Sequence, residues 1–247
     1  MVKSSDIGEQ AISKAAELGI KSQLDESESL DVNIRSHPLD LVQGNIESVS
    51  VEGKGLVMQQ DLRADKLRIE TNSISIDSLK AVMGDIELTQ STDARMLVVL
   101  KEEDIQRAFN SEFVQKKLQS LAINYEGEKV NAKIEQVKFL LPEADKVKFD
   151  ADVFLIELNR QEKICFTAIP KVNDAGSCVV LQSVKYQQDS QYNDDVGQAI
   201  IDSAEQILDI RNFKLSAMSF KVRKLDVKAG TLTIEADAEI REFPDAD

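Results

Sequence analysis

Two glycines flank a lysine in the stretch EGKGL, residues 52–56, and glycine-rich stretches of this kind often bind a phosphate group. A Walker-type phosphate loop needs a lysine followed by serine or threonine, at the junction between a strand and a helix. Here Lys54 is followed by Gly55 and Leu56. A dinucleotide-binding fingerprint would need a third glycine and the start of a helix. The stretch therefore fits neither type of phosphate site.

A period of two residues runs through the same stretch and predicts a β-strand. The apolar face of this strand carries Val49, Val51, Gly53, Gly55 and Val57. Glycines on the apolar face of a strand mark a bulge, a bend or a close approach by another group. That group is either a packed helix of the protein or a bound apolar ligand, and the sequence leaves both open.

The residue types that most often catalyse reactions or bind metals are few and scattered. The chain has one histidine, His37, just before a proline, and two separated cysteines, Cys165 and Cys178. A histidine-based triad would depend on His37 alone, and a structural zinc site needs four ligands close together. The cysteines fit two core thiols, a disulfide or reactive groups. We therefore predict no metal, no cofactor and no enzymatic activity.

The charge of the chain also limits its partners. The 247 residues carry a formal net charge of −14, and an acidic protein repels nucleic-acid phosphates. We predict no nucleic-acid partner. The longest apolar run is MLVVL at 96–100, far short of the ~20 residues of a membrane span. The N-terminal stretch lacks the pattern of a secretory signal, so we expect a cytoplasmic protein, either free or peripheral to a membrane.

Consecutive strand patterns predict an α+β fold with long antiparallel hairpins, which form a curved sheet packed on helices. Helices are predicted at 5–19, 39–43, 78–83, 100–123 and 195–209, and the helix at 100–123 can divide at Asn110 and Ser111. Strands are predicted at 30–35, 46–58, 62–76, 86–100, 132–141, 146–158, 162–171, 178–187, 213–227 and 231–243. We expect one elongated domain over residues 1–247. A weak likeness between residues 6–18 and 195–207 suggests a pseudo-repeat of helix plus hairpins at 5–100 and 195–243.

Several predicted strands carry aliphatic residues on one face, as Leu67 and Ile69 do. Aromatic residues make up only 5% of the chain, and tryptophan is absent. This composition fits a sheet curved around a filled core, or around lipid tails.

Four segments resemble the LmeA-type phospholipid-binding proteins, a domain family of largely unknown function common in cyanobacteria and actinobacteria. They are the strand into GKGL, the strand DLRADKLRIE at 61–70, the helix start LKEEDIQRA at 100–108, and the closing hairpin at 213–240. Lys101 stands where the family usually has threonine. The resemblance implies an elongated fold similar to tubular lipid-binding proteins, in which a curved sheet wraps a helix and leaves an apolar groove. Characterised relatives bind phospholipids at the cell envelope, whereas this chain fits a cytoplasmic, cyanobacterial branch.

The leading hypothesis is therefore non-enzymatic binding or shuttling of phospholipid, or a similar apolar ligand, at the cytoplasmic side of a membrane. The alternative is a protein-interaction or assembly factor for a membrane complex, with no bound ligand. Candidate lipid-binding residues are Val51, Gly53, Gly55, Val57, Leu67 and Ile69. Candidates for the headgroup are Arg63, Lys66 and Arg68.

Overall fold

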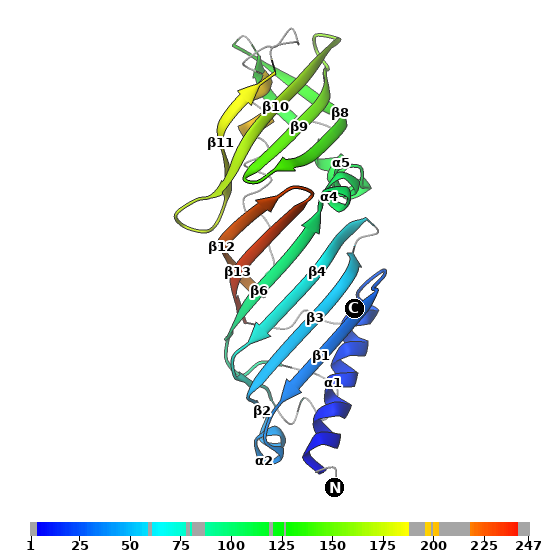
Figure 1. Cartoon of the computed structure of the whole chain (residues 1–247), viewed down its shortest axis with the longest axis vertical. Helices are drawn as coiled ribbons and strands as arrows, with labels where there is room; N and C mark the ends of the chain where they lie inside the picture. The colour runs from blue at the N-terminus through cyan, green and yellow to red at the C-terminus, as the bar shows by residue number, and fades with distance from the viewer. Residues whose placement is uncertain are drawn as a thin grey trace.

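The computed structural model describes residues 4–58, 61–77, 80, 87–118, 121–125, 127–187, 196–198, 200–202 and 218–241. The chain is mostly antiparallel β, at 62%, with a curled half-barrel sheet and few helices. Figure 1 shows two sheets that follow one another along the long axis of the molecule, with two short helices where they meet. This architecture agrees with the predicted curved antiparallel sheet.

The larger sheet has six strands and contains both the first and the last strand of the chain. Their order is β1 (Ser29–Arg35), β3 (Ser48–Met58), β4 (Leu62–Thr71), β6 (Thr92–Lys101), β13 (Thr231–Ile240) and β12 (Met218–Lys228). Two short strands, β2 (Asn45–Ile46) and β5 (Ile74–Ser75), pair at one end of the molecule. The predicted strand at 62–76 is therefore two strands, β4 and β5, with Asn72 and Ser73 between them.

The smaller sheet has five strands and the more aromatic core. Their order is β11 (Val179–Tyr186), β10 (Arg160–Val172), β9 (Lys146–Leu155), β8 (Glu128–Glu143) and β7 (Leu121–Tyr125). A chain of ring contacts, with centroids 5.4–6.1 Å apart, links Phe109, Phe139, Phe149, Phe166 and Tyr186. β7 corrects the prediction that the preceding helix continues to residue 123. Ile123 and Tyr125 alternate inward there, and the strand pairs with β8.

Helix α1 (Ser4–Ser22) confirms the predicted N-terminal helix and lies against the edge strand β1. Its side chains accept hydrogen bonds from the backbone of this edge. The Ile34 N–H donates to Ser13 Oγ, and the Ser36 N–H donates to Glu9 Oε1. An unpaired strand edge invites pairing with other chains, so α1 protects this one. Within the described residues, no helix combines the length and apolar character needed to cross a membrane.

Helices α4 (Glu102–Phe109) and α5 (Glu112–Leu118) follow β6 and lead into the smaller sheet. The predicted division of this helical region near Asn110 and Ser111 is confirmed. A further predicted helix, at 78–83, lies outside the described residues except for Lys80. The predicted helix at 195–209 is described only at 196–198 and 200–202, which are helical.

The two sheets are joined along one edge of β8. β7 pairs with only the first five residues of β8, so the later backbone groups on that side need other partners. The side-chain amide of Gln106 donates to the Val137 carbonyl at 2.6 Å and accepts from the Phe139 N–H at 2.7 Å. It occupies the place of a peptide group on a neighbouring strand. We call these contacts, with those of the next paragraph, the joint.

The joint continues two residues further along β8. Glu102 Oε2 accepts a hydrogen bond from the Leu141 N–H at 2.6 Å. The Gly230 N–H, in the turn between β12 and β13, donates to the Leu141 carbonyl at 2.9 Å. The same turn binds the helix, because the Glu102 N–H donates to the Gly230 carbonyl. Helix α4 and the last hairpin therefore complete the edge of β8 together.

Replacement of Gln106 by methionine should lower the free energy of unfolding by about 2 kcal/mol, because it leaves the Val137 carbonyl and the Phe139 N–H without their partner. Urea unfolding followed by circular dichroism measures the change. Arg107→Met is the matched control, because Arg107 is the exposed neighbour, and it should change stability by less than about 0.5 kcal/mol. Equal effects of the two substitutions would show that the joint is not a significant source of stability.

Candidate functional site

One face of the larger sheet is aliphatic across all six strands. Val51 lies opposite Ile69, which lies opposite Met96; one step along, Gly53, Leu67, Val98 and Ile234 form the next row. We call this surface the aliphatic face. Following the register, its members are Leu30, Val32, Ile34, Val49, Val51, Leu67, Ile69, Ala94, Met96, Val98, Leu100, Phe220, Val222, Leu225, Val227, Leu232, Ile234, Ala236 and Ala238.

Burial varies across the aliphatic face. On β1 the residues Leu30, Val32 and Ile34 are buried, in a cluster that includes Ala16 and Ile20 of α1. Nearer the middle of the sheet, residues on β4, β6 and β13 are only half-buried. These are Leu67, Ile69, Met96, Val98, Leu100, Leu232 and Ile234. The centre of the face therefore keeps accessible aliphatic surface, whereas its β1 edge is a closed core.

The two glycines of the EGKGL stretch are both closely approached, by parts of the protein itself. A Cβ atom on Gly53 would lie 2.6 Å from a methyl group of Leu56, and a Cβ atom on Gly55 would lie 2.5 Å from the Glu28 carboxylate. Gly55 has φ +56°, in the left-handed region that glycine adopts without strain. The predicted alternation ends there, because Leu56 and Val57 are both buried.

The candidate lipid-binding residues are therefore only partly brought together. Val51, Gly53, Leu67 and Ile69 are direct cross-strand neighbours on the aliphatic face. Gly55 lies beyond them, beneath Glu28. Met96, Val98 and Ile234 complete these rows and were not among the candidates, because their place beside Leu67 and Ile69 depends on how distant strands pair.

The candidate headgroup residues Lys66 and Arg68 lie on the other face of β4, which is polar. Lys66 is exposed and stands directly opposite Lys54, while Arg68 forms ion pairs with Glu52 and Glu70. This face is hollowed into a trough of about 960 Å³. Its charged lining comprises Arg35, Arg68, Arg95, Arg223, Asp31, Glu52, Glu70, Asp93 and Asp237. We call it the charged trough; the sheet itself separates it from the aliphatic face.

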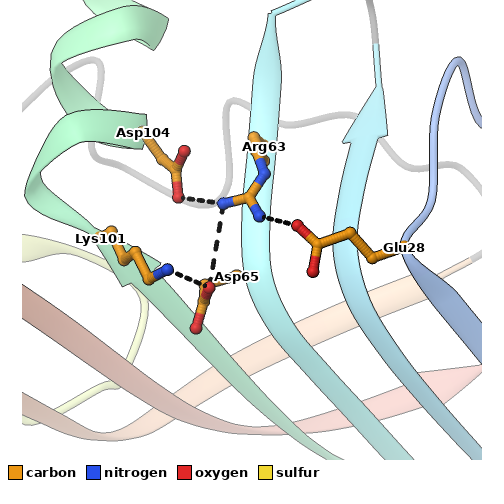
Figure 2. A network of polar contacts seen from close by, with 5 residues as sticks. All are labelled: Glu28, Arg63, Asp65, Lys101 and Asp104. Carbon is orange, nitrogen blue, oxygen red and sulfur yellow. Dashed lines mark hydrogen bonds and ion pairs between the residues drawn. The ribbon is translucent and has the colours of Figure 1, made fainter.

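Arg63, the third headgroup candidate, lies at the end of β4 within a network of ionic contacts (Figure 2). Its Nη1 is 2.8 Å from Asp104 Oδ2, and its Nη2 is 2.5 Å from Glu28 Oε1. Asp65 is 3.9 Å from the guanidinium and 2.8 Å from Lys101 Nζ. Figure 2 shows the guanidinium between Asp104 of α4 and Glu28 of the segment that precedes β1. Arg63 therefore connects three parts of the chain.

The charges of this network are unfavourable for binding an additional anion. Two cations, Arg63 and Lys101, face three carboxylates. The hydrogen bond to Glu28, together with the nearby Asp104 carboxylate, raises the pKa of Arg63. Asp104 is only 1% exposed, so its charge depends on Arg63 for compensation. The geometry thus gives Arg63 a structural role, in which a phosphate would have to displace a carboxylate.

Other reactive groups in the described residues are isolated. His37 is exposed, and its only recorded ionic contact is Glu47 at 3.8 Å. Cys165 is buried and unpaired, and burial raises the pKa of its thiol to about 11. The two cysteines, Cys165 and Cys178, form no disulfide with each other. No cluster of three or more His, Cys, Asp or Glu side chains suitable for a metal occurs in the described part of the chain.

This arrangement of side chains fits an apolar ligand best. Comparison with protein families points to the same kind of ligand. The family model for LmeA-like phospholipid-binding proteins matches residues 4–237, nearly the whole chain. The chain belongs to the LmeA-like phospholipid-binding family. This membership confirms the resemblance seen in the sequence. No curated protein and no solved structure gives a significant match.

The LmeA-like match spans both sheets, from α1 to the middle of β13. The family is one of lipid-binding domains and is not a known enzyme family. Sequence reasoning missed Glu28, Asp65 and Asp104 as partners of Arg63. Asp104 lies in the first turn of α4, where acidic residues are common, and no local pattern links it to a strand 41 residues earlier.

Substitution of Gly55 by alanine should lower the free energy of unfolding of this LmeA-like domain by about 1–2 kcal/mol. The methyl group would occupy the position of the Glu28 carboxylate, in a backbone conformation that alanine rarely adopts. Gly19→Ala is the control: it lies in α1, where an added Cβ meets no atom within 4 Å. It should raise stability by about 0.5–1 kcal/mol. Chemical denaturation measures both; a neutral Gly55→Ala would contradict the geometry.

Substitution of Arg63 by methionine should cost about 3–5 kcal/mol, because Asp104 keeps a buried charge without a partner. The double variant Arg63→Met/Asp104→Leu should be more stable than the single variant, since it removes both charges. Arg68→Met is the control, because the ion pairs of Arg68 are exposed and worth little. Differential scanning calorimetry of the four proteins distinguishes these cases. A double variant that is no more stable than Arg63→Met would refute the explanation by an unpaired charge.

Proposed function

We propose that the protein binds a phospholipid, or a similar apolar ligand, on the half-buried centre of the aliphatic face, and that it shuttles this ligand at the cytoplasmic side of a membrane. The observation that carries the proposal is the set of half-buried aliphatic residues on β4, β6 and β13. Acyl chains are recognised through such apolar surface, at roughly 25 cal/mol for each Å² removed from water.

Membership of the LmeA-like phospholipid-binding family supports a lipid ligand. The fold supports it as well, because a curled half-barrel sheet can enclose a chain-like molecule along its strands. We further propose that the fold is similar to that of tubular lipid-binding proteins. The shuttling step and its cytoplasmic location are parts of the same proposal. So does the absence of catalysis.

The three headgroup candidates do not lie on the aliphatic face. Lys66 and Arg68 lie across the sheet from the aliphatic face, and Arg63 is surrounded by carboxylates. One lipid cannot contact the aliphatic face and Lys66 without passing around the sheet, since β4 is an inner strand. The acyl chains rather than the phosphate are therefore expected to provide most of the affinity.

The charged trough supports a second candidate, a protein-interaction or assembly factor for a membrane complex. Its arginines and carboxylates could pair with complementary charges on a partner. Isolation of a stable protein partner from native lysate, with no lipid bound, would favour this candidate over lipid binding.

Native mass spectrometry tests the first candidate directly. Protein incubated with phosphatidylcholine vesicles and then separated from them should carry a phospholipid-sized mass increment. Val98→Asp should abolish this increment, because it places a charge among the aliphatic residues of β6. Val99→Asp is a closely matched control: Val99 is the next residue, equally half-buried, and its neighbours are Lys66 and Thr233 on the other face.

The control variant should retain lipid capture, and circular dichroism verifies that both variants are folded. Met96→Trp provides a second test without added charge, because the larger ring takes up space on the same face. Wild-type protein without any lipid increment would overturn the proposal. Equal capture by Val98→Asp and Val99→Asp would remove the aliphatic face as its location.

A further inference from the structure

The short helix α2 (Pro38–Val42) exposes two aliphatic side chains at one end of the molecule. Leu39 and Val42 are each 78% exposed, more than any other large hydrophobic residue among those described. They are three residues apart on a helix and therefore project to the same side. Figure 1 shows α2 at the end of the long axis opposite the five-stranded sheet. The start of α1 reaches the same end of the molecule, so a flat surface approaching this end would meet α2 and the start of α1.

The backbone of α2 is held in place by hydrogen bonds and by one half-buried side chain. The Leu41 N–H donates to the His37 carbonyl, and the Gly44 N–H donates to the Leu41 carbonyl. Leu41 itself packs against the core cluster that contains the residues of β1. At the base of the loop, Ser36 Oγ donates to the Asn45 carbonyl at 2.6 Å. The fold thus packs one aliphatic residue of α2 against the core and exposes the other two.

The charges near α2 identify the kind of surface it could meet. Arg35 is exposed there, but so is Glu47, and Asp40 lies on α2 itself. Among the described residues, no excess of basic side chains is seen beside Leu39 and Val42, and the 247 residues carry a net charge of −14. Attraction to anionic lipid is therefore not available as the driving force. The surface must be met through apolar contact.

The size of the exposed surface argues against a protein partner. Each partner in a stable protein complex contributes roughly 800 Å², from 20–30 residues. Two side chains on a five-residue helix are far fewer. A bilayer needs no complementary shape, and a pair of aliphatic side chains can enter it between the headgroups. The chain also belongs to a phospholipid-binding family.

We propose that α2 is a membrane-docking tip, whose Leu39 and Val42 insert among the acyl chains of a zwitterionic phospholipid bilayer. The inference rests on the lipid-binding function proposed above and adds the place where the protein meets the membrane. In this orientation the long axis of the molecule is roughly perpendicular to the membrane surface. The five-stranded sheet then lies at the end away from the lipid.

Tryptophan fluorescence can locate the contact, because the chain contains no tryptophan. In a Leu39→Trp variant of the full chain, phosphatidylcholine vesicles should shift the emission to shorter wavelength, and brominated phosphatidylcholine should quench it. Leu158→Trp is the matched control, since Leu158 is an exposed aliphatic residue of the loop between β9 and β10. Its emission should not change. Unchanged emission at position 39, or equal changes at both positions, would overturn the proposal.

Vesicle flotation measures the energetic contribution of the tip. The double variant Leu39→Ser/Val42→Ser should bind phosphatidylcholine vesicles about 100-fold more weakly, at roughly tenfold for each aliphatic side chain removed. Ile156→Ser/Leu158→Ser removes two exposed aliphatic residues from the loop between β9 and β10, in the smaller sheet's part of the molecule, and should bind as the wild type does. Equal losses in the two double variants would refute α2 as the docking site. Binding that requires anionic lipid would refute apolar insertion.

The proposal of a docking tip and the proposal of a ligand site can be tested separately. A short-chain phosphatidylcholine below its micellar concentration reaches the aliphatic face without any membrane. Native mass spectrometry should find it bound equally by the wild type and by Leu39→Ser/Val42→Ser. Bound lipid with no vesicle binding by the wild type would leave the proposed function intact and overturn the docking tip. Size-exclusion chromatography can also show that the wild type is a dimer and that the same double variant is a monomer. In that case a second copy of the chain covers α2, and the docking tip is overturned.

Discussion

The unpaired edge of β8 is the constraint on which the arrangement of the two sheets depends. Backbone donors and acceptors inside a protein must find partners, and β7 is too short to supply them along the whole of β8. Gln106, Glu102 and Gly230 provide them instead. Helix α4 is in turn fixed to β4 through the buried pair of Asp104 and Arg63. One short helix therefore connects both sheets through polar contacts that fit only one arrangement.

The larger sheet keeps two kinds of surface apart because side chains alternate along every strand. With all six strands in register, aliphatic residues collect on one face and charges on the other. Gly55 interrupts the alternation where β3 approaches Glu28 and the ionic network begins. The stretch that resembled a phosphate loop is thus the boundary between a regular sheet and the contacts that hold α4.

Local patterns were sufficient to predict most elements, the antiparallel α+β architecture and the family. They identified α1, the division between α4 and α5, and the face shared by Val51, Leu67 and Ile69, since each depends on residues near in sequence. Local patterns failed where residues distant in sequence determine the role of a side chain or the pairing of a strand. The role of Arg63 is set by Asp104 and Glu28, and the aliphatic face is completed by β13, which begins about 130 residues after β6 ends. The extent of β7 likewise depended on its pairing with β8.

The chain leaves the larger sheet at the end of β6 and returns to it only with β12 and β13, after building the whole of the smaller sheet. During synthesis more than 100 further residues must therefore be added before β13 can pair with the free edge of β6. Such a long sequence separation slows the search for native contacts and leaves strand edges open to the wrong neighbours. The larger sheet is consequently complete only after the chain has been synthesised through β13.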